Sequence, residues 1–85
     1  MNQTKLEQEL RGMICDLSGL PSDFDPNSNL YLDLGVASMH ALQLMLQVEE
    51  KYGIAVPDES FVEAVTLNLM TFLIQNLLSR QSSEV

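Results

Sequence analysis

The first part of the chain carries apolar side chains at helical spacing. Over residues 4–17 they recur every three or four positions with polar residues between them, which places them on one face of a helix. That face consists of Leu6, Leu10, Met13, Ile14 and Leu17. Thr4 and Glu7 have the spacing of a capping box, and Gly19 and Pro21 interrupt the pattern. The pattern predicts an amphipathic helix over residues 4–17.

A second helix is predicted over residues 38–52. Its inner stripe consists of Leu44, Val48 and Tyr52. Ser38 suits the amino-terminal cap, and Gly53 suits the carboxy-terminal stop.

The rest of the chain predicts a short turn of helix and then a final helix. Pro57 and the acids after it favour a helical turn near residues 60–63. The final helix begins at about Thr66. Its apolar arc consists of Leu67, Met70, Leu73, Ile74, Leu77 and Leu78, its polar side of Asn68, Thr71 and Gln75, and Arg80 lies near its end. No segment alternates with period two, so we expect an all-α fold.

A long loop separates the first two predicted helices. Residues 18–29 are rich in Ser, Gly, Pro, Asp and Asn, which favour turns. A loop of this length in so short a chain is usually packed or functional. We expect Phe24, Leu30 and Tyr31 to anchor it in the core.

Composition narrows the classes of function. Hydrophobic residues make up 46% of the 85 residues, enough for one core, so we expect residues 1–85 to form a single domain. Twelve acidic and four basic residues give a net charge of −8, which argues against a nucleic-acid partner. Residues 67–78 form the longest apolar stretch, shorter than the ~20 residues of a membrane span. With a polar amino-terminal segment and one cysteine, we expect a cytoplasmic monomer that does not associate with membranes.

No local set of side chains suggests catalysis. The single histidine, His40, and the single cysteine, Cys15, lie far apart in the sequence and form neither a metal cluster nor an acid–base pair. We interpret His40 as a surface residue of the second helix and Cys15 as a partly exposed thiol. The sequence therefore predicts a protein that is not an enzyme.

The acidic loop has part of a calcium-binding pattern. Oxygen-bearing side chains alternate along it, at Asp23, Asp25, Asn27 and Asn29. An EF-hand loop also needs glycine where Ser28 stands and a bidentate glutamate where Leu34 stands. We therefore interpret the segment as a solvated turn without a metal.

Two sequence blocks carry the most specific signal. Residues 33–39 read D-L-G-V-A-S-M, and residues 49–58 read E-E-K-Y-G-I-A-V-P-D. They resemble the motifs of the acyl carrier protein family, which has D-L-G-x-D-S-L at the start of its second helix and E-E-x-F/Y-x-I-x-I/V/L-P-D further on. The resemblance covers residues 30–78 without a gap. It implies a four-helix bundle with a short third helix and a long first loop.

The resemblance also implies a prosthetic group and partners. In the family the serine is esterified with 4'-phosphopantetheine, and Ser38 occupies its place. A phosphopantetheinyl transferase, a ligase that loads acyl or aminoacyl groups, and downstream transferases are then the expected partners. A phosphodiester on a serine that begins a helix would meet free N–H groups and the positive end of the helix dipole. The alternative is a serine that only caps the helix.

One departure from the family's pattern precedes the serine. Ala37 stands where the family usually has an aspartate that helps the transferase and its metal engage the carrier. Alanine cannot supply that carboxylate, so the cognate transferase must tolerate its loss, or modification is slower.

A second departure concerns docking. Family members carry acids along the second helix that basic partners recognise, whereas residues 38–48 contain no Asp, Glu, Lys or Arg. Met39, Leu42 and Leu46 point away from the inner stripe, and an exposed apolar surface there could dock partners, helped by Glu49 and Glu50. The alternative is that neighbouring segments cover the two leucines.

The cargo stays open. Residues 43–46, Q-L-M-L, with their flanking residues also resemble small stand-alone carriers that accept amino acids from ligases related to class II aminoacyl-tRNA synthetases. The cargo could equally be a fatty acyl or a polyketide group. A different class of function also fits, a small helical interaction module that carries no prosthetic group.

Overall fold

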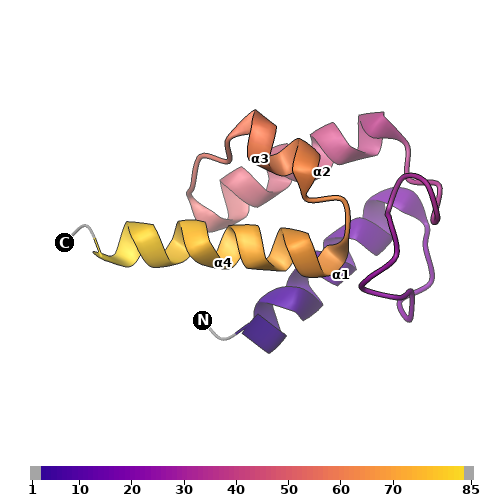
Figure 1. Cartoon of the computed structure of the whole chain (residues 1–85), viewed down its shortest axis with the longest axis horizontal. Helices are drawn as coiled ribbons and strands as arrows, with labels where there is room; N and C mark the ends of the chain where they lie inside the picture. The colour runs from indigo at the N-terminus through magenta and orange to yellow at the C-terminus, as the bar shows by residue number, and fades with distance from the viewer. Residues whose placement is uncertain (1–2, 84–85) are drawn as a thin grey trace.

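The computed structural model describes residues 3–83, which form four helices (Figure 1). Their bounds are α1 (Gln3–Ser18), α2 (Ser38–Tyr52), α3 (Asp58–Glu63) and α4 (Leu67–Ser83). Within this part of the chain no residue is in a strand. The predicted all-α fold with a short third helix and a long first loop is confirmed, and α2 has the predicted bounds.

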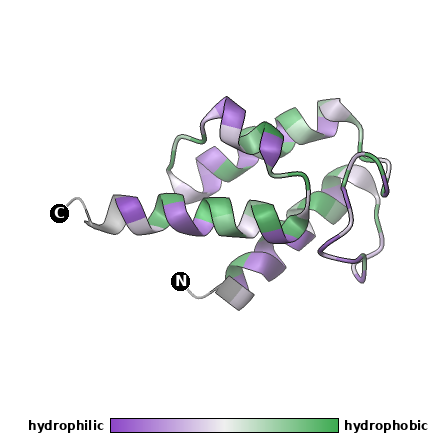
Figure 2. Ribbon diagram, in the orientation of Figure 1, coloured by the Kyte–Doolittle hydropathy of each residue, from purple (hydrophilic) through white to green (hydrophobic). Residues whose placement is uncertain are grey.

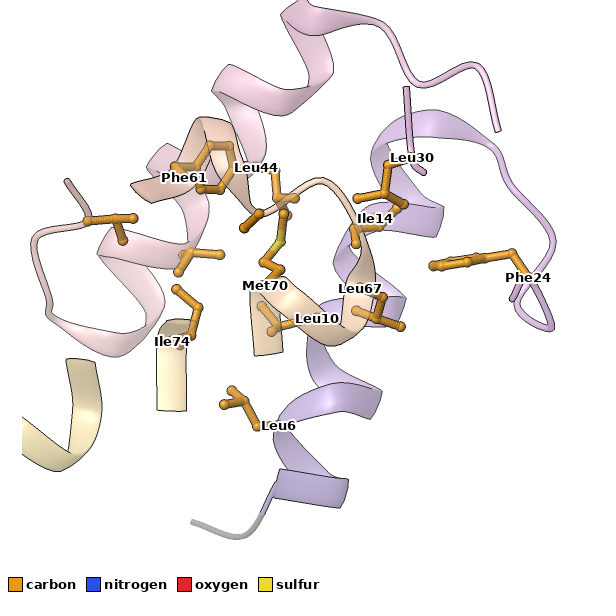
Figure 3. Packing of buried hydrophobic residues seen from close by; sticks show 13 residues of the cluster. Leu6, Leu10, Ile14, Phe24, Leu30, Leu44, Phe61, Leu67, Met70 and Ile74 are labelled. Atoms are coloured by element: carbon orange, nitrogen blue, oxygen red, sulfur yellow. The ribbon is translucent and has the colours of Figure 1, made fainter. Parts of the chain in front are cut away.

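The core lies where α1 packs against α4 and α2. Hydrophobic and hydrophilic residues alternate around each helix, so that each has an apolar face (Figure 2). The buried side chains of these three helices gather in one cluster, which includes Leu6, Leu10, Ile14, Leu44, Val48, Leu67, Met70 and Ile74 (Figure 3). Phe61 of α3 joins the cluster, and α3 packs against α4.

The ends of α1 differ in part from the prediction. Thr4 lies inside the helix, which begins at Gln3, so the capping-box expectation is wrong. Glu7 instead accepts a hydrogen bond from Arg11 Nε at 3.1 Å, one turn further along. At the other end Gly19, at φ 76°, donates its N–H to the carbonyl oxygen of Cys15. A glycine in this left-handed conformation ends the helix as expected.

One face of α4 also differs from the prediction. Thr71, expected on the polar side, is buried with 1% of its surface exposed. Its hydroxyl donates to the carbonyl oxygen of Leu67 at 2.8 Å, so the polar atom is satisfied within the helix and its methyl group can pack in the core. Two large apolar residues of this helix, Leu69 and Phe72, are exposed instead.

The long loop is clamped to α1 by Arg11. Its Nη1 atom donates to the carbonyl oxygens of Ser22 at 2.9 Å and Phe24 at 2.6 Å. The guanidinium also lies 4.6 Å from the centre of the Phe24 ring, within the range of a cation–π contact. Phe24 and Leu30 are buried and Tyr31 is half-buried, so the predicted anchors of the loop are confirmed.

The loop is also attached to α4 and the segment before it. Leu30 N–H donates to the carbonyl oxygen of Val65 at 2.8 Å, and Asn68 N–H donates to that of Pro26 at 3.1 Å. The side chain of Asn68 further donates to Asn27 Oδ1 at 2.6 Å. These bonds join segments far apart in the sequence, so the loop has a fixed path although it contains no regular structure.

A tyrosine joins the end of α2 to α1. The Tyr52 hydroxyl donates to Glu9 Oε1 at 2.6 Å. Burial, and then the hydrogen bond and negative charge of Glu9, raise the pKa of Tyr52 above its ordinary value, because both oppose ionisation of the phenol. The hydroxyl therefore remains a donor, and the bond ties the carboxy-terminal turn of α2 to the bundle.

Replacing Arg11 with alanine should lower the free energy of unfolding by about 2 kcal/mol or more, since two carbonyl oxygens lose a charged donor and Phe24 loses its cation. Lys51→Ala, which removes an exposed positive charge from α2, should cost less than about 1 kcal/mol. Urea unfolding followed by circular dichroism measures both. Equal losses would contradict a specific clamp at Arg11.

Candidate functional site

The loop ends in a turn that two polar side chains hold. Asn29 Oδ1 accepts the N–H groups of Tyr31 and Leu32, both at 2.9 Å. Asp33 Oδ2 accepts the N–H of Asn29 at 2.9 Å, and the carbonyl oxygen of Asn29 accepts the N–H of Asp33 at 2.9 Å. Asn and Asp favour such turns because their short side chains reach nearby backbone N–H groups. Asp33 of the D-L-G motif therefore closes this turn.

Gly35 and Val36 carry the chain from this turn to α2. Gly35 has φ 73°, a left-handed conformation that costs glycine little because it has no Cβ. Val36 N–H donates to the carbonyl oxygen of Leu30 at 2.8 Å, and Leu30 is buried. The start of α2 is therefore held against the core through Leu30.

Ser38 is the first residue of α2 and is exposed. The cap position is Ala37, with φ −74° and ψ 146°, so the expectation that Ser38 caps the helix is wrong. Ala37 accepts the N–H groups of His40 and Ala41 with its carbonyl oxygen, but it has no side-chain acceptor for the first turn. The Ser38 hydroxyl therefore sits at a helix start with uncapped N–H groups and no acid in the first turn.

An apolar groove opens beside Ser38, between α2 and α3. Its volume is about 490 Å³, within the range of small-molecule sites. It is lined by Tyr31, Ser38, Ala41, Leu42, Met45, Asp58, Phe61 and Val62. Asp58 is its one formally charged lining residue, and burial raises the pKa of Tyr31, which keeps that phenol neutral. The groove can receive an apolar group attached to the serine.

Sequence reasoning missed this groove. Its walls come from two helices and from Tyr31 of the loop, and α3 lies about one helix length further along the chain than Ser38. The motif marked the serine, and Phe61 and Val62 carried no pattern that would place them beside it. Only the tertiary fold, in which α3 packs against α4, brings these residues together.

The outer side of α2 carries an exposed apolar surface. Met39 is 69% exposed, and Leu42 and Leu46 are each 55% exposed. The alternative that neighbouring segments cover the two leucines is therefore wrong. We call Met39, Leu42 and Leu46 the α2 apolar surface; Val62 of α3, also exposed, lines the groove together with Leu42.

The two acids at the end of α2 have different surroundings. Glu50 is exposed, whereas Glu49 is half-buried. Glu49 Oε2 accepts the N–H of Val56 at 2.8 Å, in the segment that leads to α3. Glu50 is thus displayed to solvent, while the carboxylate of Glu49 already has a partner within the fold.

His40 and Cys15 lie apart from the groove lining. His40 is half-buried, not a surface residue as expected, because it packs in the crevice between α1 and the loop beside Leu17. Cys15 is half-buried, as predicted, and its Sγ donates to the carbonyl oxygen of Pro21 at 3.7 Å. Burial raises the pKa of the Cys15 thiol, with a smaller opposing effect from Arg11. A thiol with a raised pKa is a poor nucleophile.

The oxygens of the acidic loop take part in the fold. Asp25 Oδ1 accepts the N–H of Asn27 at 2.8 Å, and Asn27 Oδ1 accepts from Asn68. Between residues 3 and 83 no group of three or more His, Cys, Asp or Glu side chains could hold a metal ion. Over the same range no helix is long and apolar enough to cross a membrane.

Comparison with known proteins identifies the class of protein, a carrier of phosphopantetheine. The family model described as the phosphopantetheine attachment site matches residues 8–71. The chain therefore belongs to this family, with 4'-phosphopantetheine as its prosthetic group and acyl carrier proteins among its relatives.

The relatives match over most of their length. An acyl carrier protein of Campylobacter hominis is 30% identical over 82% of this chain and 90% of its own. One of Thermosynechococcus vestitus is 27% identical over 89% and 95%, respectively. A meromycolate extension acyl carrier protein of Mycolicibacterium aurum is 29% identical over 89% and 79%. The predicted family, that of the acyl carrier proteins, is confirmed.

Replacing Ala37 with aspartate or asparagine should raise the free energy of unfolding by about 0.5–2 kcal/mol, because either side chain can accept an N–H group of the uncapped first turn. Gln43→Asp, which adds an acid in the middle of α2 out of reach of that turn, is the control and should not stabilise the protein. Thermal and urea unfolding measure the effect. If neither variant at residue 37 gains stability, the first turn does not need a cap.

Proposed function

We propose that Ser38 carries the 4'-phosphopantetheine arm and that the protein presents acyl or aminoacyl thioesters on it to partner enzymes. The observation that carries this proposal is the position of the Ser38 hydroxyl, exposed at the start of α2 and next to an apolar groove. In the modification, Ser38 Oγ would form a bond to the phosphorus of a donor that carries phosphopantetheine on a pyrophosphate, and the bond from that phosphorus to the donor's nucleoside phosphate would break. The nucleoside phosphate would leave, and the hydroxyl proton would pass to a base of the transferase. The cargo is then held as a thioester at the far end of the arm.

The surroundings of Ser38 suit a phosphodiester. The product carries a negative charge, and the start of α2 offers backbone N–H groups and the positive end of the helix dipole. An anion at such a place gains about 0.3–1 kcal/mol. The first turn contains no acid that would repel it, and the cap position before it holds Ala37 in place of the aspartate usual in the family.

The mechanism is tethering. A covalent arm replaces diffusion of the cargo with a local concentration on the order of millimolar at each docked enzyme. The carrier itself supplies no catalytic group and needs only weak docking that exchanges readily. The acidic charge and the single cysteine favour a cytoplasmic protein that works as a monomer.

Docking is proposed to use the α2 apolar surface. Met39, Leu42 and Leu46 follow Ser38 along one side of α2, and residues 38–48 contain no Asp, Glu, Lys or Arg. A partner that covers these side chains would remove apolar area from water. A phosphopantetheinyl transferase, a loading ligase and downstream transferases would then bind the same side in turn.

The cargo remains a proposal at the level of acyl or aminoacyl groups. The groove is apolar and favours an uncharged chain, while the likeness to stand-alone aminoacyl carriers favours an amino acid. The rival function is an interaction module that binds partners through the α2 apolar surface and carries no arm. Modification of Ser38 separates the two.

Co-expression with a phosphopantetheinyl transferase should add the mass of one phosphopantetheine to the intact protein. Ser38→Ala should abolish the added mass and leave the circular dichroism spectrum unchanged, because the Ser38 side chain is exposed and makes no cap bond. Ser60→Ala, at a half-buried serine in α3, is the matched control and should still be modified. An adduct that persists in Ser38→Ala would refute the site, and no adduct on the unaltered chain would favour the rival.

Truncating Leu42 or Leu46 to alanine should weaken binding of the loading enzyme by roughly 1–3 kcal/mol, because each removes apolar area from the interface. Glu50→Gln should have little effect, and added salt should change the affinity only slightly. A salt series measured by calorimetry tests both. If recognition were electrostatic, affinity would fall steeply as the Debye length shortens toward about 8 Å near physiological ionic strength, and the leucine variants would be silent.

A further inference from the structure

The link between α2 and α3 is organised by one residue. The carbonyl oxygen of Glu49 accepts the N–H groups of Gly53 at 2.9 Å and Ile54 at 3.3 Å. Its carboxylate oxygen Oε2 accepts the N–H of Val56 at 2.8 Å. Glu49 thus accepts three of the backbone N–H groups between the end of α2 and Pro57. The two bonds to the carbonyl oxygen of Glu49 shape the turn at the end of α2. Of the three bonds, the one to its carboxylate is nearest in the chain to α3.

α3 cannot hold its own position. It has six residues, whereas isolated helices shorter than about 12–15 residues are marginal in water. Its cap residue, Pro57, supplies no side-chain hydrogen bond. The helix is held by burial of Phe61 and by its two connections, in which Val56 and Ala64 are buried. The connection that contains Val56 is the one that Glu49 secures.

The position of α3 sets the width of the groove. Asp58, Phe61 and Val62 line the groove from α3, and Ser38 and Leu42 are among the residues that line it from α2. Pro57 joins the segment before Asp58 to α3, and its carbonyl oxygen accepts the N–H of Phe61 at 3.0 Å, so we expect the first turn of α3 to follow that segment if it loosens. An interaction that holds Val56 in place would therefore help to hold α3 beside the groove next to Ser38.

We propose that Glu49 is a positioning residue, whose carboxylate bond to Val56 N–H holds α3 in place as the wall of the groove beside Ser38. Glu49 then acts within the carrier, and Glu50, one residue further on and exposed, is the acid that partners can reach. A bond to a charged acceptor in a half-buried place is worth more than one at the surface. The importance of the groove for cargo rests on the proposed function, whereas the bond itself does not.

The test is amide hydrogen exchange on the unmodified full chain, followed by NMR. Glu49→Ala removes the acceptor and the charge, Glu49→Gln removes the charge but keeps an acceptor oxygen, and Glu50→Ala is the matched control. In Glu49→Ala, exchange at Val56 and at the hydrogen-bonded amides of Phe61 and Ala64 should be about tenfold faster, while core amides of α1 and α4 keep their rates. Glu49→Gln should retain most of the protection, and Glu50→Ala should match the unaltered chain.

Three results would overturn the proposal. Unchanged exchange in α3 of Glu49→Ala would show that the bond does not position it. An equal acceleration in all helices would show that Glu49 only contributes to global stability. Exchange in Glu49→Gln as fast as in Glu49→Ala would show that the charge, not the hydrogen bond, is responsible. Because the unmodified chain is used, failure here is separate from failure to modify Ser38.

Discussion

The attachment of the loop over residues 19–37 to α1 and α4 is the constraint on which the rest of the structure depends. This segment has no regular secondary structure of its own, yet it delivers the first turn of α2 to a defined place. Arg11 holds its first half by two carbonyl oxygens, and Leu30 fixes its second half through the bond to Val65 and its own burial. Without these contacts the start of α2 would have no fixed position relative to the core.

The charged surface of the molecule and its exposed apolar surface lie on different residues. Acids give the chain its net charge of −8, but the side of α2 next to Ser38 is apolar and uncharged. Negative charge keeps such a small protein soluble although it exposes large apolar side chains. Recognition and solubility thus use different residues, which allows the apolar side of α2 to stay exposed between encounters with partners.

Local sequence patterns were sufficient to predict those helices in which the apolar side chains recur at one regular spacing. The stripes of Leu6, Leu10 and Ile14 and of Leu44 and Val48 marked α1 and α2, because a regular period directs those residues to one side. Residue type predicted Thr71 on the polar side of α4, but a bond to the helix's own backbone lets this threonine be buried. His40 of α2 is less exposed than predicted, because residues of α1 and of the loop line the same crevice.

The sequence by itself determined the four helices, the loop anchors and the serine within its motif, because each depends on residues near one another in the chain. The tertiary structure alone decided the groove, the exposure of Leu42 and Leu46, and the engagement of Glu49 by Val56. The groove and the Glu49 bond involve both α2 and α3 or the link between them. The exposure of the two leucines depends on the absence of another segment over that side of α2. The spacing of residues along a helix predicts which face each residue occupies. Which other segment packs against that face depends on how the helices are arranged in the fold.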